Sequence, residues 1–272
     1  MSQLPKKQGL YDPAMERDNC GVGLVAHLQK QASRAIVEDA NEMMVRMHHR
    51  GGCGCDPKDG DGAGMLVGMP HSFNRKVAME ELGVTLPKDG DYGVGIIFTG
   101  KSDASEASAK SIVEASARRR GMKVLGWRTL PVDNSDLGKM AKGSEPRTLQ
   151  CFVDNSKGLS NRDFERELYF VNKTSSMEAA ELVGEGEDPG FYCCSMSSQT
   201  VTYKGQLTTA QVSDTRYDCC CYHYYHCCIF GNKMFSLARS RRPFCTEWYL
   251  CLPACLPVSG CCGSHYFTFF FF

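Results

Sequence analysis

The sequence predicts an α+β domain followed by a segment of different character. Helical and strand patterns occur in pairs from residue 20 to about residue 207, and such pairs could build two facing sheets with helices outside. From about residue 213 onward neither a helical nor a strand period is found. We therefore expect a leader or propeptide at 1–19, a domain at 20–212 and an aberrant or disordered tail at 213–272.

The first part of the domain shows one clear helix between two strands. After an apolar run at 20–28, a helix is predicted over 31–48 from apolar residues at helical spacing: Ile36, Ala40, Met43, Met44 and Met47. The basic His48-His49-Arg50 suits a helix C-terminus, and Gly51 is expected to end the helix. A glycine-rich loop at 51–64 then leads into a strand at 65–69.

Helices and strands alternate from residue 71 onward. Helices are predicted at 72–82, 102–120 and 162–180, and strands at 91–98, 122–130 and 148–153. Gly121 is expected to close the second of these helices. Two further strands, at 190–197 and 200–203, predict a β-hairpin about Ser198-Gln199.

The stretch Asp18-Asn19-Cys20-Gly21-Val22-Gly23 is the strongest candidate for chemistry. Its two glycines let the backbone pass close to whatever lies beside the Cys20 thiol. A cut before Cys20 would give this residue a thiol and a free α-amine, whose ordinary pKa of about 7.7–8.0 suits a general base near neutral pH. Such a residue can attack an amide. The alternative is a buried strand cysteine without a chemical role.

A second stretch favours a chemical role for Cys20 over a structural one. It reads His48-His49-Arg50-Gly51-Gly52-Cys53-Gly54-Cys55-Asp56 and continues to Gly60-Asp61-Gly62-Ala63-Gly64. In order and spacing, the two stretches resemble the N-terminal glutaminase domain of glutamate synthases, which are class II glutamine amidotransferases. Other class II amidotransferases share the cysteine and His-Arg-Gly without the Gly-Asp-Gly-Ala-Gly extension. The Gly-Cys-Asp variant and the leader Leu10-Tyr11-Asp12-Pro13 most resemble the NADH-dependent eukaryotic form.

The resemblance implies a four-layer αββα N-terminal-nucleophile hydrolase fold, incomplete here and followed by an unrelated tail. It implies that Cys20 is the nucleophile in the hydrolysis of glutamine to glutamate and ammonia, and that Arg50 and Gly51 help to hold the substrate. The alternative for Arg50 is a helix-terminal charge in solvent. In glutamate biosynthesis the ammonia would aminate 2-oxoglutarate in the remaining synthase domains, with FMN, an iron–sulfur cluster and NADH. None of these cofactors is expected in this chain.

The glycine-rich loop is open to other interpretations, and the sequence argues against three of them. An EF-hand aligned on Gly62 would place Pro57 at its first ligand position. The glycine spacing does not match a dinucleotide-binding turn. Cys53 and Cys55 are too few for a zinc site. We expect a backbone that is closely approached beside an active site, with a flexible turn as the alternative.

Composition narrows the class of protein. The formal net charge is zero, which gives no indication of nucleic-acid or acidic-membrane binding. The chain lacks both an apolar run long enough for a transmembrane helix and a secretory signal pattern, so we expect a cytoplasmic protein, or a plastid one if the N-terminus is incomplete. Of its 16 cysteines, only those at 20, 53, 55, 151, 193 and 194 precede residue 215, and scattered cysteines suit a reducing compartment.

The tail has an unusual composition. Cysteines and histidines cluster at 219–228, and the chain ends in a run of phenylalanines at 269–272. Zinc binding is one interpretation, although adjacent cysteines rarely chelate one tetrahedral ion. We favour a retained intron or a frameshift. The family's arginine-containing strand and the Asn-Gly pair of its oxyanion hole are not found, so an inactive fragment or a binding module is the alternative to an active glutaminase.

Overall fold

The computed structural model describes residues 6–9, 12, 21–29, 31–51, 56–183 and 190–212, together with the backbone of 267–271. Cys20, Cys53 and Cys55 lie outside the described residues. So do most of the leader and the Cys/His cluster at 219–228. The predictions made for those residues therefore remain predictions.

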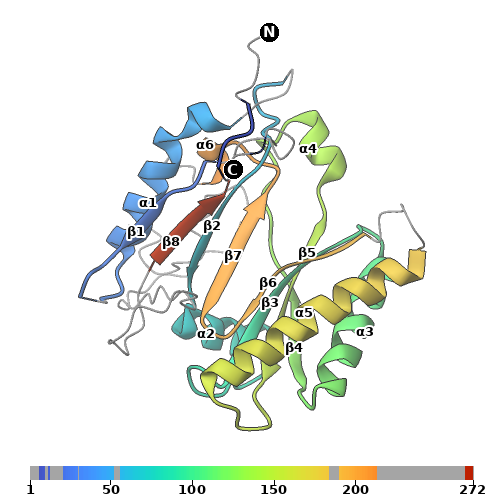
Figure 1. The fold of residues 1–272 in the computed structure, drawn as a ribbon. Helices are drawn as coiled ribbons and strands as arrows, with labels where there is room; N and C mark the ends of the chain where they lie inside the picture. The colour runs from blue at the N-terminus through green and yellow to red at the C-terminus, as the bar shows by residue number, and fades with distance from the viewer. Residues whose placement is uncertain are drawn as a thin grey trace.

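Two antiparallel four-stranded sheets form the framework (Figure 1). The first has the order β1-β8-β2-β7 and contains β1 (Leu24–Ala26), β8 (Phe267–Phe271), β2 (Ala63–Gly68) and β7 (Thr200–Gly205). The second has the order β4-β5-β3-β6 and contains β4 (Val124–Thr129), β5 (Arg147–Asp154), β3 (Tyr92–Thr99) and β6 (Phe191–Ser197).

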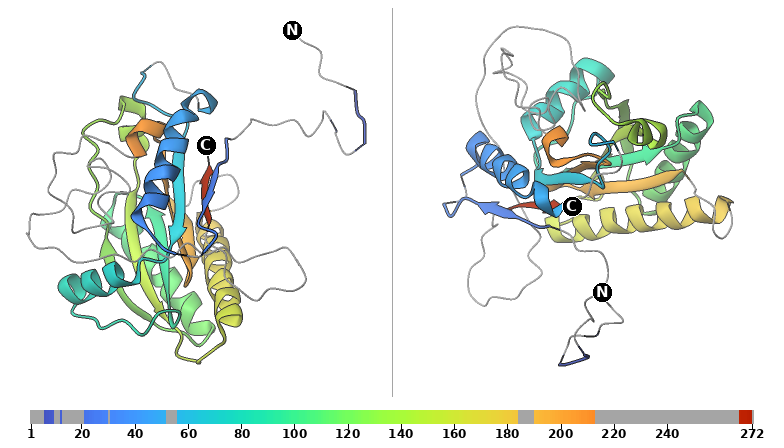
Figure 2. Two further views of the ribbon diagram at one scale, coloured as in Figure 1. Left: turned by 90° about the vertical axis from the view of Figure 1, so that its left-hand side faces the viewer. Right: turned by 90° about the horizontal axis from the view of Figure 1, so that it is seen from above.

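The helices pack against these sheets. They are α1 (Arg34–Arg46), α2 (His71–Leu82), α3 (Asp103–Arg119), α4 (Lys139–Ser144), α5 (Asn161–Val183) and α6 (Thr209–Val212), with a 3-10 turn η2 (His48–Arg50) after α1. Two perpendicular views place α2 and α5 on opposite sides of the strands (Figure 2). The α+β class that the sequence predicts is therefore confirmed.

Helices α3 and α5 cover one face of the second sheet. Apolar side chains of both helices form one buried cluster with alternate residues of β5: Val113, Ala117, Phe164, Leu168, Val171, Leu149, Cys151 and Val153. Helix α5 approaches the sheet so closely that a Cβ on Gly93 of β3 would lie 2.6 Å from Leu168 Cδ1. The predicted ends of α3 are confirmed: Ser102 Oγ accepts from Ser105 N (3.1 Å), and Gly121 has φ +71°.

The opposite face of the second sheet belongs to a larger core. Tyr92, Val94 and Ile96 of β3 alternate with the residues that face α5, as a two-residue period requires. They pack in one cluster with residues from β2, β7, α1 and α2: Met65, Val67, Val201, Tyr203, Ala40, Met44, Val77 and Ala78. One core cluster therefore joins the two sheets together with α1 and α2, and the other joins the second sheet to α3 and α5.

The predicted hairpin about Ser198-Gln199 is wrong. Strand β6 pairs with β3 in the second sheet, whereas β7 pairs with β2 in the first. Ser197 Oγ accepts from Gln199 N (3.0 Å) and Thr200 N (3.1 Å), and the Glu165 carboxylate of α5 accepts from Ser198 N (2.6 Å). Because side chains satisfy the amides of the bend, the chain can cross from one sheet to the other without a hairpin ladder.

The tail contains a strand that its composition does not predict. The backbone of β8 lies between β1 and β2, with Phe269 opposite both Leu24 and Leu66. A central strand is held by main-chain hydrogen bonds, which do not require an alternating sequence. Residues 267–271 thus form a strand, whereas residues 213–266 lie outside the described part, and the aberrant or disordered tail at 213–272 stays a prediction.

Other boundaries differ by a few residues. Helix α1 begins at Arg34 rather than near residue 31, because Ser33 Oγ accepts from Ile36 N (3.4 Å) and caps it. The α-helix stops at Arg46, and η2 continues the chain to Gly51. Helices α4 and α6 are too short to show a period in the sequence.

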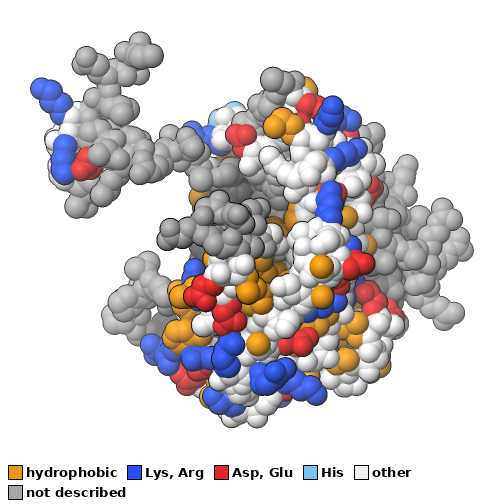
Figure 3. Space-filling view, turned by 90° about the vertical axis from the view of Figure 1, so that its right-hand side faces the viewer, with side chains coloured by type: hydrophobic (Ala, Val, Ile, Leu, Met, Phe, Trp, Pro, Cys, Tyr) orange, Lys and Arg blue, Asp and Glu red, His pale blue; other side chains and the backbone are white. Residues whose placement is uncertain are grey.

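The surface agrees with the balanced composition. On the face seen in Figure 3, Lys and Arg side chains are interspersed with Asp and Glu rather than gathered into one patch. Within the described ranges, no helix combines the length and apolar character that a membrane span requires.

Candidate functional site

The segments before β1, after α1 and before β2, which carry the sequence motifs, lie at one end of the first sheet. Strands β1 and β2 are both antiparallel to β8 and so run in the same direction, while β7 runs in the opposite direction. The residues before β1, the glycines before β2 and the end of β7 at Gly205 therefore share one end of the sheet. Helix α1 runs back alongside β1 and brings Arg50 and Gly51 to this end as well (Figure 1).

Of the predicted site residues, the structure describes Arg50 and Gly51 but not Cys20. Cys20 lies outside the described residues, but it is bonded to Gly21, which is buried. Arg50 and Gly51 are exposed, and their amides donate to Met47 O (2.8 Å) and His48 O (3.1 Å). Among the described residues the Arg50 side chain has no hydrogen-bond or ion-pair partner. The structure thus brings Arg50 and Gly51 to the same end as Gly21, while their role in holding the substrate stays a prediction.

The glycine-rich loop is closely approached by backbone, as the sequence predicts. A Cβ on Gly60 would lie 2.4 Å from the carbonyl of Leu207, and one on Gly64 would lie 2.5 Å from Lys204 Cβ. Gly62 has φ +137°, which side-chain-bearing residues rarely adopt. The alternative of a merely flexible turn does not fit these contacts.

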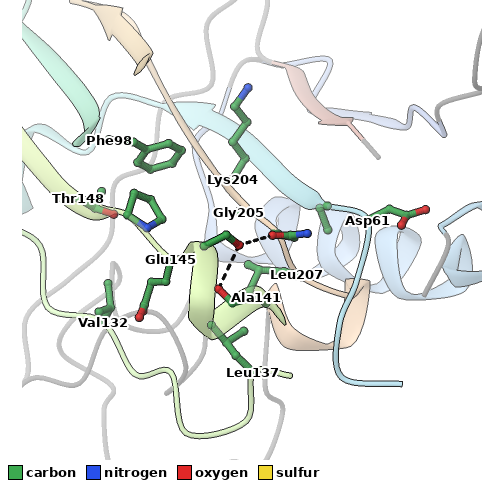
Figure 4. Close-up of a pocket in the computed structure, with 15 residues that line it drawn as sticks. Asp61, Phe98, Val132, Leu137, Ala141, Glu145, Thr148, Lys204, Gly205 and Leu207 are labelled. Carbon is green, nitrogen blue, oxygen red and sulfur yellow. Dashed lines mark hydrogen bonds between the residues drawn. The ribbon is translucent and has the colours of Figure 1, made fainter. Parts of the chain in front are cut away.

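A cavity of about 540 Å³ lies at this end of the sheets (Figure 4). Its walls come from the start of β2, the end of β7, the loop after β4, and α4 with the start of β5. Fifteen residues line it: Asp61, Gly62, Ala63, Phe98, Val132, Leu137, Ala141, Ser144, Glu145, Pro146, Thr148, Lys204, Gly205, Gln206 and Leu207. A volume of this size is typical of sites for small molecules.

The cavity combines apolar walls with a few polar groups. Ser144 Oγ donates to Gln206 Oε1 (2.7 Å), and this pair spans from α4 to the end of β7. The Glu145 carboxylate accepts from Asn134 Nδ2 (2.8 Å). Lys204 Nζ donates to Tyr192 OH (2.5 Å). The residues that line the cavity therefore include donors, acceptors and charged side chains as well as apolar ones.

The described thiols are unsuited to nucleophilic attack. Burial raises the pKa of Cys151 and of Cys194 to about 12. Burial also raises the pKa of Cys193 well above its ordinary value. All three are thus protonated near neutral pH and poorly reactive, so they do not compete with Cys20 for the role of nucleophile. The part of the chain that the structure describes also contains no group of three His, Cys, Asp or Glu side chains that could hold a metal ion.

Two buried polar residues at this end, Asp59 and Gln211, are not predicted from the sequence. The Asp59 carboxylate accepts from Met140 N (3.2 Å) and Ala141 N (2.9 Å), the first-turn amides of α4. Gln211 Nε2 donates to Lys58 O (3.1 Å) and to Asp136 O (2.8 Å). The sequence signal at Asp59, an acid among glycines before a strand, indicates only a turn, because its partners lie far along the chain.

A second polar cluster lies at the opposite end of β2. His71 Nδ1 lies 2.9 Å from Tyr92 OH and 3.5 Å from Asp89 Oδ1. Burial lowers the pKa of His71; nearby Asp89 opposes this shift, and Arg75 adds to it. The cluster is therefore a candidate for pH-dependent stability, away from the candidate site.

Comparison with known proteins identifies the family. The family model for class-II glutamine amidotransferases matches residues 20–236. The chain belongs to this family. Membership confirms the N-terminal-nucleophile hydrolase fold class, and the matched region begins at Cys20. It also extends past residue 212, into residues outside the described part.

Curated relatives are glutamate synthases. Glutamate synthase [NADH] of Schizosaccharomyces pombe is 42% identical over 216 residues, covering 77% of this chain and 10% of the relative. Glutamate synthase [NADPH] large chain of Bacillus subtilis is 42% identical over 212 residues, covering 78% and 13%. Ferredoxin-dependent glutamate synthase 1 of Arabidopsis thaliana is 38% identical over 204 residues, covering 75% and 12%. The chain thus spans about a tenth of these relatives' length, and their names cover three electron donors.

Proposed function

We propose that this chain is the glutaminase part of a glutamate synthase, which hydrolyses glutamine to supply ammonia for the amination of 2-oxoglutarate. The supporting observation is the class II amidotransferase match that begins at Cys20 and includes the His-Arg-Gly and glycine-rich stretches. The described parts of these stretches lie at one end of the first sheet, and Asp61, Gly62 and Ala63 of the glycine-rich stretch line a cavity of suitable size.

The proposed reaction uses Cys20 after removal of residues 1–19. The free amine, directly or through a water molecule, accepts the thiol proton while sulfur attacks the side-chain amide carbon of glutamine. The protonated amine returns a proton to the leaving nitrogen, the C–N bond breaks, and ammonia departs from a glutamyl thioester. Water then adds to the thioester, the C–S bond breaks, and glutamate and the free thiol are released.

Arg50 and Gly51 are the proposed substrate-binding residues. Both lie at the same end of the sheet as Gly21, and both are exposed. An arginine can bind a carboxylate through two parallel hydrogen bonds, and glutamine carries such a group. Arg50 is therefore suited to orient the substrate or to order the residues around the nucleophile.

The remainder of the synthase is proposed to lie outside this chain. FMN, an iron–sulfur cluster and NADH would act in those domains, where ammonia meets 2-oxoglutarate. The choice of NADH over NADPH or ferredoxin rests on the Gly54-Cys55-Asp56 variant and the leader at 10–13. The relatives themselves include all three kinds of enzyme.

A second candidate is an inactive fragment or binding module. No Asn-Gly dipeptide occurs in the sequence, although the resemblance implies that such a pair supplies the oxyanion hole. Loss of one oxyanion donor typically slows acyl transfer by about 10²–10³-fold. On this alternative, the 272-residue chain trimmed to Cys20 hydrolyses glutamine negligibly beside a chain that carries the family's whole domain.

The test is the Cys20→Ser variant of the full-length enzyme that contains this sequence. We expect loss of glutamine-dependent glutamate formation, while ammonia-dependent formation persists. Cys151→Ala is the matched control, because the Cys151 thiol is buried and protonated, and it should retain both activities. Intact-mass measurement should show that the active enzyme has lost residues 1–19. Glutamine-dependent activity in Cys20→Ser, or in a chain still carrying Met1, would refute the proposal.

A further inference from the structure

We propose that Asp59 is a positioning residue for the glutamine site, which fixes the loop at residues 56–62, before β2, to helix α4. This inference rests on the proposed function. Asp59 does not line the cavity, so its effect on a ligand must pass through the segments that it joins. Its contacts, its burial and the location of those segments carry the proposal.

Asp59 supplies a cap that α4 cannot make for itself. The residue before the helix is Gly138, which has no side chain with which to accept from the first-turn amides. The Asp59 oxygens take that place, at 3.2 Å from Met140 N and 2.9 Å from Ala141 N. A Cβ on Gly138 would lie 2.1 Å from Asp59 Oδ1, so the contact needs glycine at 138 as well as the acid at 59.

Because Asp59 is buried, its carboxylate depends on the amides of α4 as much as α4 depends on the carboxylate. Asp59 is only 6% exposed, and a buried carboxylate is costly unless hydrogen bonds compensate for its lost hydration. Within the described part of the chain, no cation pairs with it; the adjacent Lys58 instead pairs with Asp136 (2.7 Å). The two amides of α4 are therefore the main compensation for the charge, and the loop and the helix hold each other in place.

The same part of the loop is attached at further points. Gly138 N donates to Lys58 O (3.1 Å), and Gln211 Nε2 donates to the same carbonyl (3.1 Å). Gly60 lies against the backbone of Leu207. Residues 58–60 are thus held between the loop that leads into α4 and the turn after β7.

These attachments bear on the cavity because the three joined segments form its walls. Asp61 and Gly62 lie two and three residues after Asp59, Ala141 and Ser144 belong to α4, and Leu207 follows β7 (Figure 4). Releasing Asp59 would let the loop move relative to α4 and would change the geometry of the wall. Small misplacements of this kind can cost about 100-fold in rate.

The first test breaks the contact from each side in the full-length enzyme. Asp59→Asn keeps the shape but places an NH₂ group against a backbone N–H, and Gly138→Ala pushes a methyl group into the carboxylate. We expect each to lower kcat/KM for glutamine about 10- to 100-fold, mainly through KM, with ammonia-dependent activity unchanged. Gly143→Ala is the matched control on α4, because its added Cβ meets nothing within 4 Å.

A double variant separates positioning from helix stability. Gly138 has extended backbone angles, so in Asp59→Ala/Gly138→Ser the new hydroxyl can cap α4 from the usual position. The serine Cβ would lie 2.8 Å from the backbone nitrogen of residue 59, which keeps the loop displaced from α4. We expect its thermal stability to recover toward that of the parent, while KM for glutamine stays raised because the loop is still detached. Recovery of KM together with stability would show that Asp59 only stabilises α4, and would overturn the inference.

Hydrogen exchange tests the contact without relying on activity. In the 272-residue chain, Asp59→Asn should increase amide exchange over residues 139–144 relative to Gly143→Ala. Unchanged exchange would refute the inference, as would an unchanged KM in an enzyme that Cys20→Ser inactivates. An enzyme without glutamine-dependent activity would instead refute the proposed function, and exchange alone would then decide whether Asp59 holds α4.

Discussion

The bend about Ser198-Gln199 is the corner at which the chain crosses from the second sheet to the first, and it gives a quantitative stability prediction. Glu165 Oε1 accepts from Ser198 N and Ser198 Oγ (both 2.6 Å), and Oε2 accepts from Ser197 Oγ (2.9 Å). Ser198 is 1% exposed. Glu165→Ala would therefore leave a buried amide and two hydroxyls to find other partners.

The expected loss of unfolding free energy follows from these contacts. An unsatisfied buried donor costs about 1–3 kcal/mol, and a hydrogen bond to a charged group contributes about 1.5–3 kcal/mol. The three bonds share one carboxylate that is half-buried, and the hydroxyls can rotate toward other acceptors, so the contributions will not add. We expect Glu165→Ala to lower the free energy of unfolding by about 2–4 kcal/mol, and Glu165→Gln to lower it by less, since it keeps one acceptor.

Urea unfolding followed by far-UV circular dichroism measures this loss. Glu181→Ala is the matched control, because Glu181 lies on the same helix and is exposed. The control should stay within about 0.5 kcal/mol of the parent. A Glu165→Ala midpoint equal to that of the control would show that the carboxylate does not hold the corner.

Three further predictions concern packing, pH and thiol reactivity. Gly60→Ala should lower the melting temperature, because its Cβ would lie 2.4 Å from the Leu207 carbonyl carbon, whereas Gly143→Ala should change it little; equal melting temperatures would contradict the close approach. Burial lowers the pKa of His71, so the unfolded chain binds more protons than the folded chain, and the free energy of unfolding should fall as the pH drops below 6.5. His71→Asn should weaken this pH dependence in urea titrations between pH 8 and 5.5. An unchanged slope of the free energy of unfolding against pH would contradict the prediction. The Cys151 thiol, with its pKa raised to about 12, should resist iodoacetamide at pH 7.5 in the native protein and react in urea; native labelling detected by mass spectrometry would contradict its burial.

The sequence by itself determined the elements that depend on local chemistry. Helix α3 could be predicted from its period and from its ends, because a serine at 102 and a glycine at 121 satisfy the terminal amides and carbonyls locally. The same holds for the two sequence stretches that indicate the family. Their residue types and spacing predict Cys20 chemistry before any fold is known, and the family match begins at that residue.

Only the tertiary structure decided which elements meet. The pattern of β7 predicts a strand but not its pairing with β2, and Glu165 on a distant helix satisfies the bend that sends it there. Asp59 likewise indicates a turn in sequence, while its role as the cap of α4 depends on residues 81 and 82 positions away. Periodicity records which side of an element is buried. It does not record the partner, because hydrogen bonds between distant segments form only once packing has brought their atoms within about 3 Å.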